Sequence, residues 1–372
     1  MLTRASEILE VPEKELKVFS VQDTFNNNNT LSGCLCRRSD HRYGAIVLFT
    51  INEEETEQII WATPKLHYPM DISGRTHWPK NVIDVQAYEK LDGTNILAYR
   101  YFYKGKEFTT FKTRLTPVVL KSAFGDFLGM WKELLTEDKS INKVISSNPN
   151  HNLSFELYGW RNPITIKYSF PLKSALLFGI ERSSGEITPR VKLSDHQATP
   201  SLKTILFKDF GDLDKLYNEI RDEATEQNAE ELLVEGFVFY VKSNSGWRMF
   251  KCKAEQIETL HRLASAGITK QSLWATAINA HEDTDNVTID YYLELLKEEY
   301  DEVKIGRSMV RIEKTLIEVK DHLKFVKKVN ERIVEAKETG LDVTKDKNSF
   351  MRHMSKFFQK NEMRKVGSIV LK

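Results

Sequence analysis

The segment Glu89–Asn95, which reads Glu-Lys-Leu-Asp-Gly-Thr-Asn, carries the clearest chemical signal in this sequence. Lys90 is the residue to explain, because a lysine amine can attack the α-phosphate of a nucleoside triphosphate and carry the nucleotide as a phosphoramidate. A lysine is inert in this role at neutral pH unless burial or nearby positive charge lowers its pKa. The string also has a plainer interpretation, since short charged runs that end in Asp-Gly usually form a turn between strands. The rest of the chain must therefore supply the other groups that such chemistry needs.

Nucleotide transfer places negative charge on phosphate oxygens, so a working site needs further cations and carboxylates. Arg114 lies just beyond a predicted strand, from which it could reach a phosphate or a ribose, although it could equally be an ordinary surface arginine. Glu156 lies inside the apolar run Leu153–Gly159, where a carboxylate is unfavourable without a partner. A buried salt bridge and a hydrogen bond to a ribose would each provide that partner.

Further candidates lie on later strands. Phe178 could stack on a base, although core packing is the default for a single phenylalanine. Glu235 begins another apolar strand. Lys251 and Lys253 alternate along a strand, so their side chains point to the same face. Two like charges side by side are unfavourable unless an anion lies between them, and a triphosphate would serve as that anion.

A framework of short strands up to about residue 257 must position these residues. Two β-rich runs, Gly44–Ile51 and Gln58–Ala62, flank the acidic stretch Asn52–Glu57, which we expect to form a hairpin. Helical periodicity is found over Leu120–Leu135 and Leu213–Ala224. Further strands are predicted at Ile96–Tyr103, Glu107–Lys112, Ser154–Tyr158, Ser174–Ile180, Glu235–Val241 and Arg248–Cys252. The layout is α+β, with strands in antiparallel order rather than a βαβ series.

After Ala254 the strand pattern gives way to helices. The predicted helices are Ala254–Ala264, Thr269–His281, Thr288–Val303, Ser308–Glu338 and Thr344–Gln359. Gly340 is placed to end the longest of them. The sequence therefore predicts two domains: residues 1–257 contain a mixed sheet region, and residues 258–372 are helical.

Composition is that of a soluble globular protein. Of its residues, 41% are hydrophobic and 29% are charged. The length of 372 residues is enough for two domains and a substantial core. No run is apolar enough to span a bilayer, and the N-terminus lacks the apolar core of a signal peptide. Cys34, Cys36 and Cys252 have no cysteine or histidine partners at zinc spacing, so disulfides and structural zinc are not expected. We expect a cytoplasmic protein without a membrane partner.

Charge is unevenly distributed, although the net charge is only +1. From Glu282 to Glu302 there are nine acidic residues and one lysine, whereas Val303–Lys372 contains eighteen Lys and Arg against nine Asp and Glu. The basic segment could contact a phosphate backbone. On charge alone, a solvated helical face is an equally good interpretation.

In their order along the chain, these residues resemble a known set of motifs. Lys-x-Asp-Gly, an arginine, Phe-Glu, an aromatic strand, Glu-Gly-Phe-Val and Lys-x-Lys resemble motifs I, Ia, III, IIIa, IV and V of the covalent nucleotidyltransferase superfamily. That superfamily contains ATP-dependent DNA ligases, RNA ligases and mRNA-capping guanylyltransferases. The resemblance covers roughly residues 85–255. It implies an α+β nucleotidyltransferase (ATP-grasp-like ligase) domain with antiparallel sheets, followed here by an all-helical C-terminal domain.

The region after motif V distinguishes the members. DNA ligases and capping enzymes continue with an OB-fold that ends in an Arg-x-Asp-Lys-like motif, whereas this chain has predicted helices and no Arg-x-Asp-Lys string there. A varied, often helical C-terminal domain resembles RNA ligases instead. Asn95 gives the Lys-x-Asp-Gly-x-Asn form of several RNA ligase clades, in which the asparagine is implicated near the 3′-OH end of the acceptor strand. Simple turn chemistry would also explain Asn95.

Phage-type RNA ligases also have an N-terminal region whose arginine and lysine bind the triphosphate. The segments between Gly44 and Pro69 loosely resemble it, but the arginine has no clean match because Tyr43 precedes Gly44. The candidates for these contacts are Arg37, Arg38, Arg42, Lys65 and Arg75.

The resemblance also implies catalytic roles. Lys90 would be the nucleophile, and Lys251 and Lys253 would neutralise the α-phosphate. Glu235 would help to place a divalent metal, Mg²⁺ or alternatively Mn²⁺, bound largely through water and phosphate oxygens. Asp92 would orient the loop of the nucleophile or a metal-bound water.

The remaining implied roles concern ATP binding. Arg114 and Glu156 would hold the ribose, and Phe178 would stack on adenine. The other residues of the expected ATP site are Glu89, Gly93 and Asn95.

The sequence thus predicts an ATP-dependent RNA ligase that joins 5′-phosphate and 3′-OH RNA ends through a lysyl-AMP intermediate. It would act in the cytoplasm, or in a host cytoplasm if a phage or virus encodes it. Two alternatives remain open: a DNA or nick-sealing ligase that lacks an OB-fold, and a non-catalytic RNA-binding relative. For the basic C-terminal helices, substrate binding is favoured over dimerisation.

Overall fold

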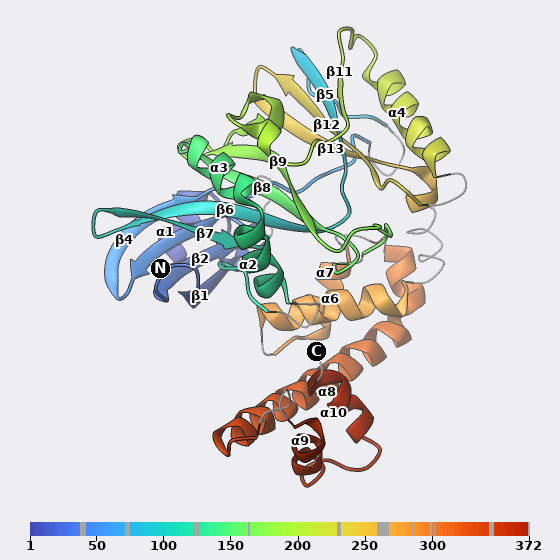
Figure 1. Cartoon of the computed structure of the whole chain (residues 1–372). Helices are drawn as coiled ribbons and strands as arrows, with labels where there is room; N and C mark the ends of the chain where they lie inside the picture. The colour runs from blue at the N-terminus through green and yellow to red at the C-terminus, as the bar shows by residue number, and fades with distance from the viewer. Residues whose placement is uncertain are drawn as a thin grey trace. The chain divides into compact units, whose positions relative to one another are not determined.

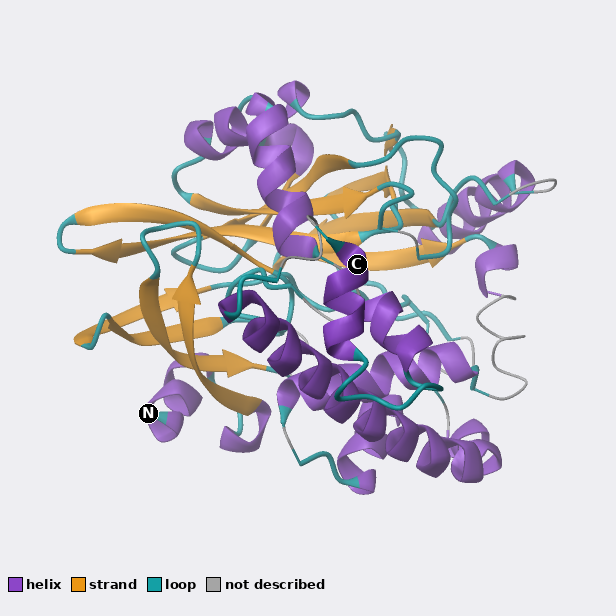
Figure 2. Ribbon diagram, turned by 60° about the horizontal axis from the view of Figure 1, so that its bottom comes forward, coloured by secondary structure: helices purple, strands orange, loops and turns teal. Residues whose placement is uncertain are grey.

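The computed structural model describes the chain except for residues 38–41, 71–74, 122–125, 163, 229–231, 259–267, 285, 298–299, 301, 342–345 and 371–372. The chain divides into two compact units, Met1–Thr259 and Leu260–Lys372 (Figure 1). The described strands all belong to the first unit, and the described elements of the second are helices (Figure 2). The α+β prediction with antiparallel sheets and C-terminal helices is therefore confirmed.

The first sheet is formed by the N-terminal strands in the order β1-β2-β3-β4. The elements of this region are α1 (Leu2–Leu9), β1 (Leu16–Asp23), β2 (Asn29–Cys36), β3 (Ile46–Ile51) and β4 (Glu54–Ile60). The expected hairpin is present between β3 and β4, with a turn at Asn52 and Glu53, whose φ angles are 50° and 69°. Asparagine tolerates this left-handed conformation, which lets a two-residue turn follow the twist of the strands.

The second sheet of the first unit has five strands in the order β10-β9-β8-β6-β7. Its strands are β6 (Thr94–Tyr103), β7 (Lys106–Lys112), β8 (His151–Tyr158), β9 (Lys173–Glu181) and β10 (Ile187–Pro189). Two helices, α2 (Phe127–Glu137) and α3 (Lys139–Ser147), cover one face, where Trp131 and Phe155 are fully buried. The sequence predicted α2 with an earlier start, partly outside the described residues, and did not predict α3.

The third sheet has the order β11-β5-β12-β13 and includes β5, the strand that ends just before Lys90. Its strands are β5 (Asp84–Glu89), β11 (Thr204–Leu206), β12 (Gly236–Ser243) and β13 (Gly246–Lys253). The amphipathic helix α4 (Leu213–Gln227) packs Tyr217 against Phe237 and Phe239 of this sheet. Another buried cluster contains residues of both this sheet and the second one, among them Tyr88 and Leu97. The two sheets therefore share one core.

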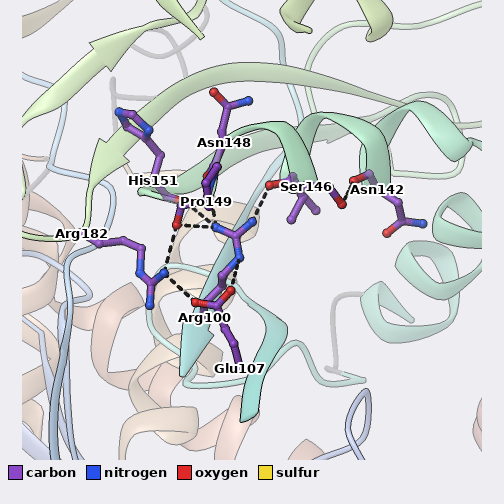
Figure 3. A network of polar contacts seen from close by, with 9 residues as sticks. Arg100, Glu107, Asn142, Ser146, Asn148, Pro149, His151 and Arg182 are labelled. Carbon is purple, nitrogen blue, oxygen red and sulfur yellow. Dashed lines mark hydrogen bonds and ion pairs between the residues drawn. The ribbon is translucent and has the colours of Figure 1, made fainter. Parts of the chain in front are cut away.

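A buried arginine fastens the hairpin of β6 and β7 to the end of α3 (Figure 3). The guanidinium of Arg100 donates to the carbonyl of Ile145, to those of Asn148 at 3.1 Å and Pro149 at 2.9 Å, and to that of His151 at 3.3 Å. These carbonyls lie at and just beyond a helix C-terminus, where backbone acceptors lack intrahelical partners. Glu107 on β7 balances the charge with an ion pair of 3.3 Å.

The described helices of the second unit form two hydrophobic clusters along one long helix. The helices are α6 (Lys270–Asp283), α7 (Ile289–Lys297), α8 (Glu302–Glu338), α9 (Lys347–Met354) and α10 (Met363–Val370). Gly340, predicted as the stop of the longest helix, has a φ of +84° and donates its amide to the Lys337 carbonyl at 2.9 Å. Of the helices in the described part of the chain, none is both long and apolar enough to cross a membrane.

Candidate functional site

Strand pairing in the third sheet determines the position of Lys90. Lys90 follows the last residue of β5, and its amide donates to the carbonyl of Gly236 at 2.8 Å. Gly236 begins β12 and lies opposite Lys253 at the end of β13. The ends of these strands therefore bring Lys90, Glu235 and Lys253 together, although 145 residues separate the first two in sequence.

Glu235 bridges the two lysines. One carboxylate oxygen pairs with Nζ of Lys90, and the other lies 2.9 Å from Nζ of Lys253. The carboxylate is buried, with a residue exposure of 5%. Burial acts to raise the pKa of Glu235, but the charges of Lys90 and Lys253 outweigh it and lower the pKa. The site therefore contains two cations and one carboxylate, a composition that suits binding of a larger anion.

Lys251 lies at the same edge, and an N-terminal segment covers it. Its amide donates to the carbonyl of His67 at 2.9 Å, and its Nζ lies 4.4 Å from the ring centroid of Tyr68. The segment before β5, which loosely resembles the triphosphate-binding region, is therefore in contact with β13. Of the other N-terminal candidates, Arg42 stacks on the ring of Trp61 at 4.5 Å, and Arg38 lies outside the described residues.

Asp92 holds the loop of the nucleophile in place. It is 5% exposed, and its carboxylate accepts hydrogen bonds from the amides of Thr165 and Ile166, the second at 2.7 Å. Its own amide donates to the hydroxyl of Tyr168 at 2.9 Å. Burial raises the pKa of Asp92, although these amides act in the opposite direction. This geometry fits the expected role in orienting the loop; the carboxylate is directed at backbone amides.

Gly93 is required by the close approach of β8. A Cβ atom at Gly93 would lie 2.2 Å from the carbonyl oxygen of Leu157. Any side chain would therefore displace the loop from the sheet. Two positions later, the Asn95 side chain donates to Ser154 Oγ at 2.8 Å and accepts from Thr63 Oγ1 at 2.9 Å. Asn95 lies in β6 rather than in a turn, and it joins β6, β8 and the N-terminal segment.

Glu156 and Arg114 form a second charged group near Lys90. Burial raises the pKa of Glu156 to about 7, while the charges of Lys90 and Arg114 act to lower it. The Glu156 carboxylate accepts no hydrogen bond and forms no ion pair with the described residues, so the salt bridge considered from the sequence is not found there. Arg114 Nε is buried and has no hydrogen-bond partner among the described residues. A buried carboxylate with a raised pKa and a buried guanidinium nitrogen without a hydrogen-bond partner among the described residues fit a ligand that carries hydroxyls.

Two further residues of the expected ATP site have contacts within the fold. Phe178 is 4% exposed and packs its ring against Tyr240, with centroids 6.2 Å apart, which is the position of a core residue. Glu89 Oε2 accepts from the amide of Lys203 at 3.3 Å. These contacts support the sheet beneath the loop of Lys90.

Sequence reasoning missed two residues that shape this site. Lys112 is fully buried, and its Nζ donates to the carbonyls of Thr113 at 2.8 Å and Arg114 at 3.0 Å. Burial lowers the pKa of Lys112 to about 7. Tyr168, which bonds to the amide of Asp92, was the other. Lys112 alternates with Phe108 and Thr110 along a predicted strand, so its inward position could have been recognised from the sequence, whereas nothing near Tyr168 indicates its partner.

The site offers limited protein ligands for a metal. Among the described residues, no group of three or more His, Cys, Asp or Glu side chains converges as a metal cage would require. Glu235 could supply one oxygen, and the other ligands would be water and the phosphate oxygens of a bound nucleotide, which is how Mg²⁺ is usually held at such sites.

No protein-family model matches the sequence, and no curated protein matches it. The structure is similar to that of an archaeal ATP-dependent RNA ligase, with a TM-score of 0.49, 16% identity and coverage of 89% of this chain and 82% of the ligase. A structure described as an ATP-dependent DNA ligase from Aquifex aeolicus gives a TM-score of 0.46 at 13% identity, covering 96% of this chain and 89% of that one. A structure of a Naegleria gruberi RNA ligase mutant with ATP and Mn gives a TM-score of 0.33 at 12% identity. The match covers 67% of this chain and 99% of that one.

Proposed function

We propose that this protein is an ATP-dependent RNA ligase that joins 5′-phosphate and 3′-OH ends through a lysyl-AMP intermediate. The observation that carries the proposal is the contact of Lys90, Glu235 and Lys253 at the ends of neighbouring strands. This arrangement supplies a nucleophile, a second cation for phosphate charge and a carboxylate that can leave both lysines when an anion binds. The order of motifs supports nucleotidyl transfer through a lysine, and the helical region after Lys253 together with Asn95 favours an RNA ligase.

The reaction would proceed in three displacements, the first two at the phosphorus of AMP and the third at the 5′-phosphorus of the RNA. The Lys90 amine attacks the α-phosphate of ATP, loses a proton and expels pyrophosphate. An oxygen of the RNA 5′-phosphate then attacks the same phosphorus, the N–P bond breaks, and the amine regains a proton. Finally, a 3′-OH attacks the RNA 5′-phosphorus and expels AMP.

The surrounding residues would position the nucleotide. Lys251 and Lys253 would face the α-phosphate, and Glu156 with Arg114 would bind the ribose, which would give the buried Arg114 Nε a hydrogen-bond partner. Mg²⁺ or Mn²⁺, held in part by Glu235, would neutralise phosphate charge. Asp92 and Gly93 would keep Lys90 in place by anchoring its loop.

Covalent labelling tests the proposal. The protein is incubated with Mg²⁺ and ATP, GTP or NAD labelled in the transferable nucleotide, and the denatured protein is examined for bound label. We expect an acid-labile, alkali-stable adduct from ATP alone. Lys90→Ala should abolish it, and Lys242→Ala, a matched change on β12, should not. Absence of an adduct, or labelling of Lys90→Ala, would show that the proposal is wrong.

The polymer is then identified with the adenylated protein. We expect AMP to move to 5′-phosphorylated RNA and, after addition of a 3′-OH end, ligated RNA to form. Transfer only to DNA ends or nicks would instead support the alternative ligase. RNA binding without any adduct would support the non-catalytic relative.

A further inference from the structure

The loop between β8 and β9, residues 159–172, is bonded to the loop of the nucleophile. Its described residues include Asn162, whose side chain donates to the Leu157 carbonyl at 2.7 Å and to Thr94 Oγ1 at 3.0 Å. The amides of Thr165 and Ile166, as given above, bond to Asp92. Asp92 and Thr94 are therefore bonded to this loop. Gly93, between them, packs closely against the Leu157 carbonyl of the strand that leads into the loop.

Backbone hydrogen bonds and ring contacts also join the two ends of the loop. The amide of Trp160 donates to the Phe170 carbonyl at 3.0 Å, and that of Arg161 donates to the Pro171 carbonyl at 3.1 Å. The rings of Tyr158, Tyr168 and Phe170 contact one another with centroids 5.1 to 5.4 Å apart. The loop is thus a preformed surface whose position is tied to that of Lys90.

The outer side of this surface is aromatic and basic. Trp160 and Ile164 are each 56% exposed. Between Glu156 and Glu181 the sequence contains no acidic residue, whereas Arg161, Lys167 and Lys173 lie on the loop or just after it. Arg161 pairs with Glu133, and Lys173 Nζ lies over the Phe170 ring at 4.3 Å. An exposed indole among cations, beside a phosphate-handling site, has the composition of a surface that binds single-stranded nucleic acid.

We propose that the described residues of the loop 159–172 bind the 5′-phosphorylated RNA end that receives AMP from Lys90, with Trp160 stacked on its terminal base. Lys167 and Lys173 face the phosphates of that strand. The 5′ end is favoured over the 3′-OH end because a terminal phosphate monoester carries more negative charge. The loop itself contains no carboxylate, and Lys167 and Lys173 add to the charge of Arg161, which pairs with Glu133. Stacking accepts any base, so the first nucleotide is bound without sequence preference. The inference rests on the proposed ligase function.

The test follows the transfer of AMP from isolated lysyl-AMP protein to a 5′-phosphorylated single-stranded RNA. For Trp160→Ala we expect the RNA concentration that gives half-maximal transfer to rise about tenfold, the range of one lost base stack. Trp160→Phe keeps an aromatic ring, so its half-maximal RNA concentration should stay close to that of the unchanged protein. Leu206→Ala, which changes another exposed apolar residue on β11, should behave like the unchanged protein. Matching unfolding temperatures would exclude a folding defect.

A binding measurement separates failure of this inference from failure of the ligase proposal. Equilibrium binding of the same RNA to unadenylated protein needs no chemistry; weaker binding by Trp160→Ala in a protein that forms no lysyl-AMP would keep the surface and reject the enzyme. Equal binding and equal transfer in Trp160→Ala and unchanged protein would overturn the surface. An effect seen only when pre-adenylated RNA is joined to a 3′-OH strand would overturn the assignment to the 5′ end.

Discussion

At the residue scale, Glu156 is the carboxylate of the candidate site whose pKa the fold raises to about 7. Its buried carboxylate has a pKa of about 7, against about 4.5 in an unfolded chain. Between these values the folded state binds more protons than the unfolded state. The contribution of Glu156 to stability therefore falls as pH rises from about 4.5 to about 7. A bound ribose would offset this loss by donating hydrogen bonds to the charged form.

We expect Glu156→Gln to flatten this pH dependence. The amide has nearly the same shape and no charge to desolvate, so the variant should exceed the unchanged protein in stability at pH 8 by roughly 1–3 kcal/mol, with little difference at pH 4.5. Urea unfolding at both pH values measures the change. Glu219→Gln on the exposed side of α4 is the control. A stability difference that is the same at both pH values would contradict the stated environment of Glu156.

Residue types at strand positions indicated part of the site, and long-range contacts determined the rest. Alternation along β13 predicted that Lys251 and Lys253 share a face, and Glu235 was recognised as a glutamate that begins an apolar strand. The structure adds that Glu235 pairs with both Lys90 and Lys253. By contrast, the bonds from Asp92 to residues 73 and 74 positions later have no local sequence signal.

At the element scale, the network around Arg100 governs how α3 meets the second sheet. Arg100→Met would leave the carbonyls at the end of α3 buried without donors, so we expect a loss of about 2–4 kcal/mol in the free energy of unfolding. Hydrogen exchange should show the amides of α3 opening first.

Arg182→Met is the matched comparison for this prediction. Arg182 also pairs with Glu107, at 2.8 Å, but its side chain is 24% exposed, so its loss should cost about 0–1 kcal/mol. Equal effects of the two changes would mean that the carbonyl contacts of Arg100 do not stabilise α3.

Elements with strong periodicity could be predicted, whereas short ones could not. The strands β6, β7, β8 and β9 lie within a few residues of their expected limits because each is bounded by turn residues. The helix α3 has only nine residues, and α10 has the β-rich sequence Met-Arg-Lys-Val-Gly-Ser-Ile-Val. Tertiary packing, through Ile141 and Val144 in one and Val366 in the other, stabilises these helices beyond their intrinsic preference.

At the scale of the whole molecule, the candidate site and the excess of positive charge belong to different units. All residues assigned to nucleotide chemistry precede Thr259, and each unit has buried clusters of its own. The basic segment that begins at Val303 lies in the second unit. We therefore expect adenylylation and RNA affinity to be separable.

A chain that ends at Thr259 should still form lysyl-AMP but bind RNA less tightly and with a weaker dependence on salt. Each lost phosphate contact reduces the slope of log affinity against log salt by about 0.7 for a single strand. Binding of a labelled RNA at several salt concentrations, to full-length and shortened protein, measures this slope. An unchanged slope would assign the basic helices to another role, such as dimerisation. Loss of lysyl-AMP would show that the units depend on each other.

The bridge from Glu235 to Lys90 and Lys253 has a consequence for selectivity. In the free protein the carboxylate acts as a built-in competitor, because an incoming anion must replace it at both ammonium groups. Inorganic phosphate offers few contacts in return, whereas a nucleoside triphosphate brings several phosphate charges together with a ribose and a base. On the proposed function, the bridge would disfavour small anions and favour ligands large enough to replace every one of its contacts.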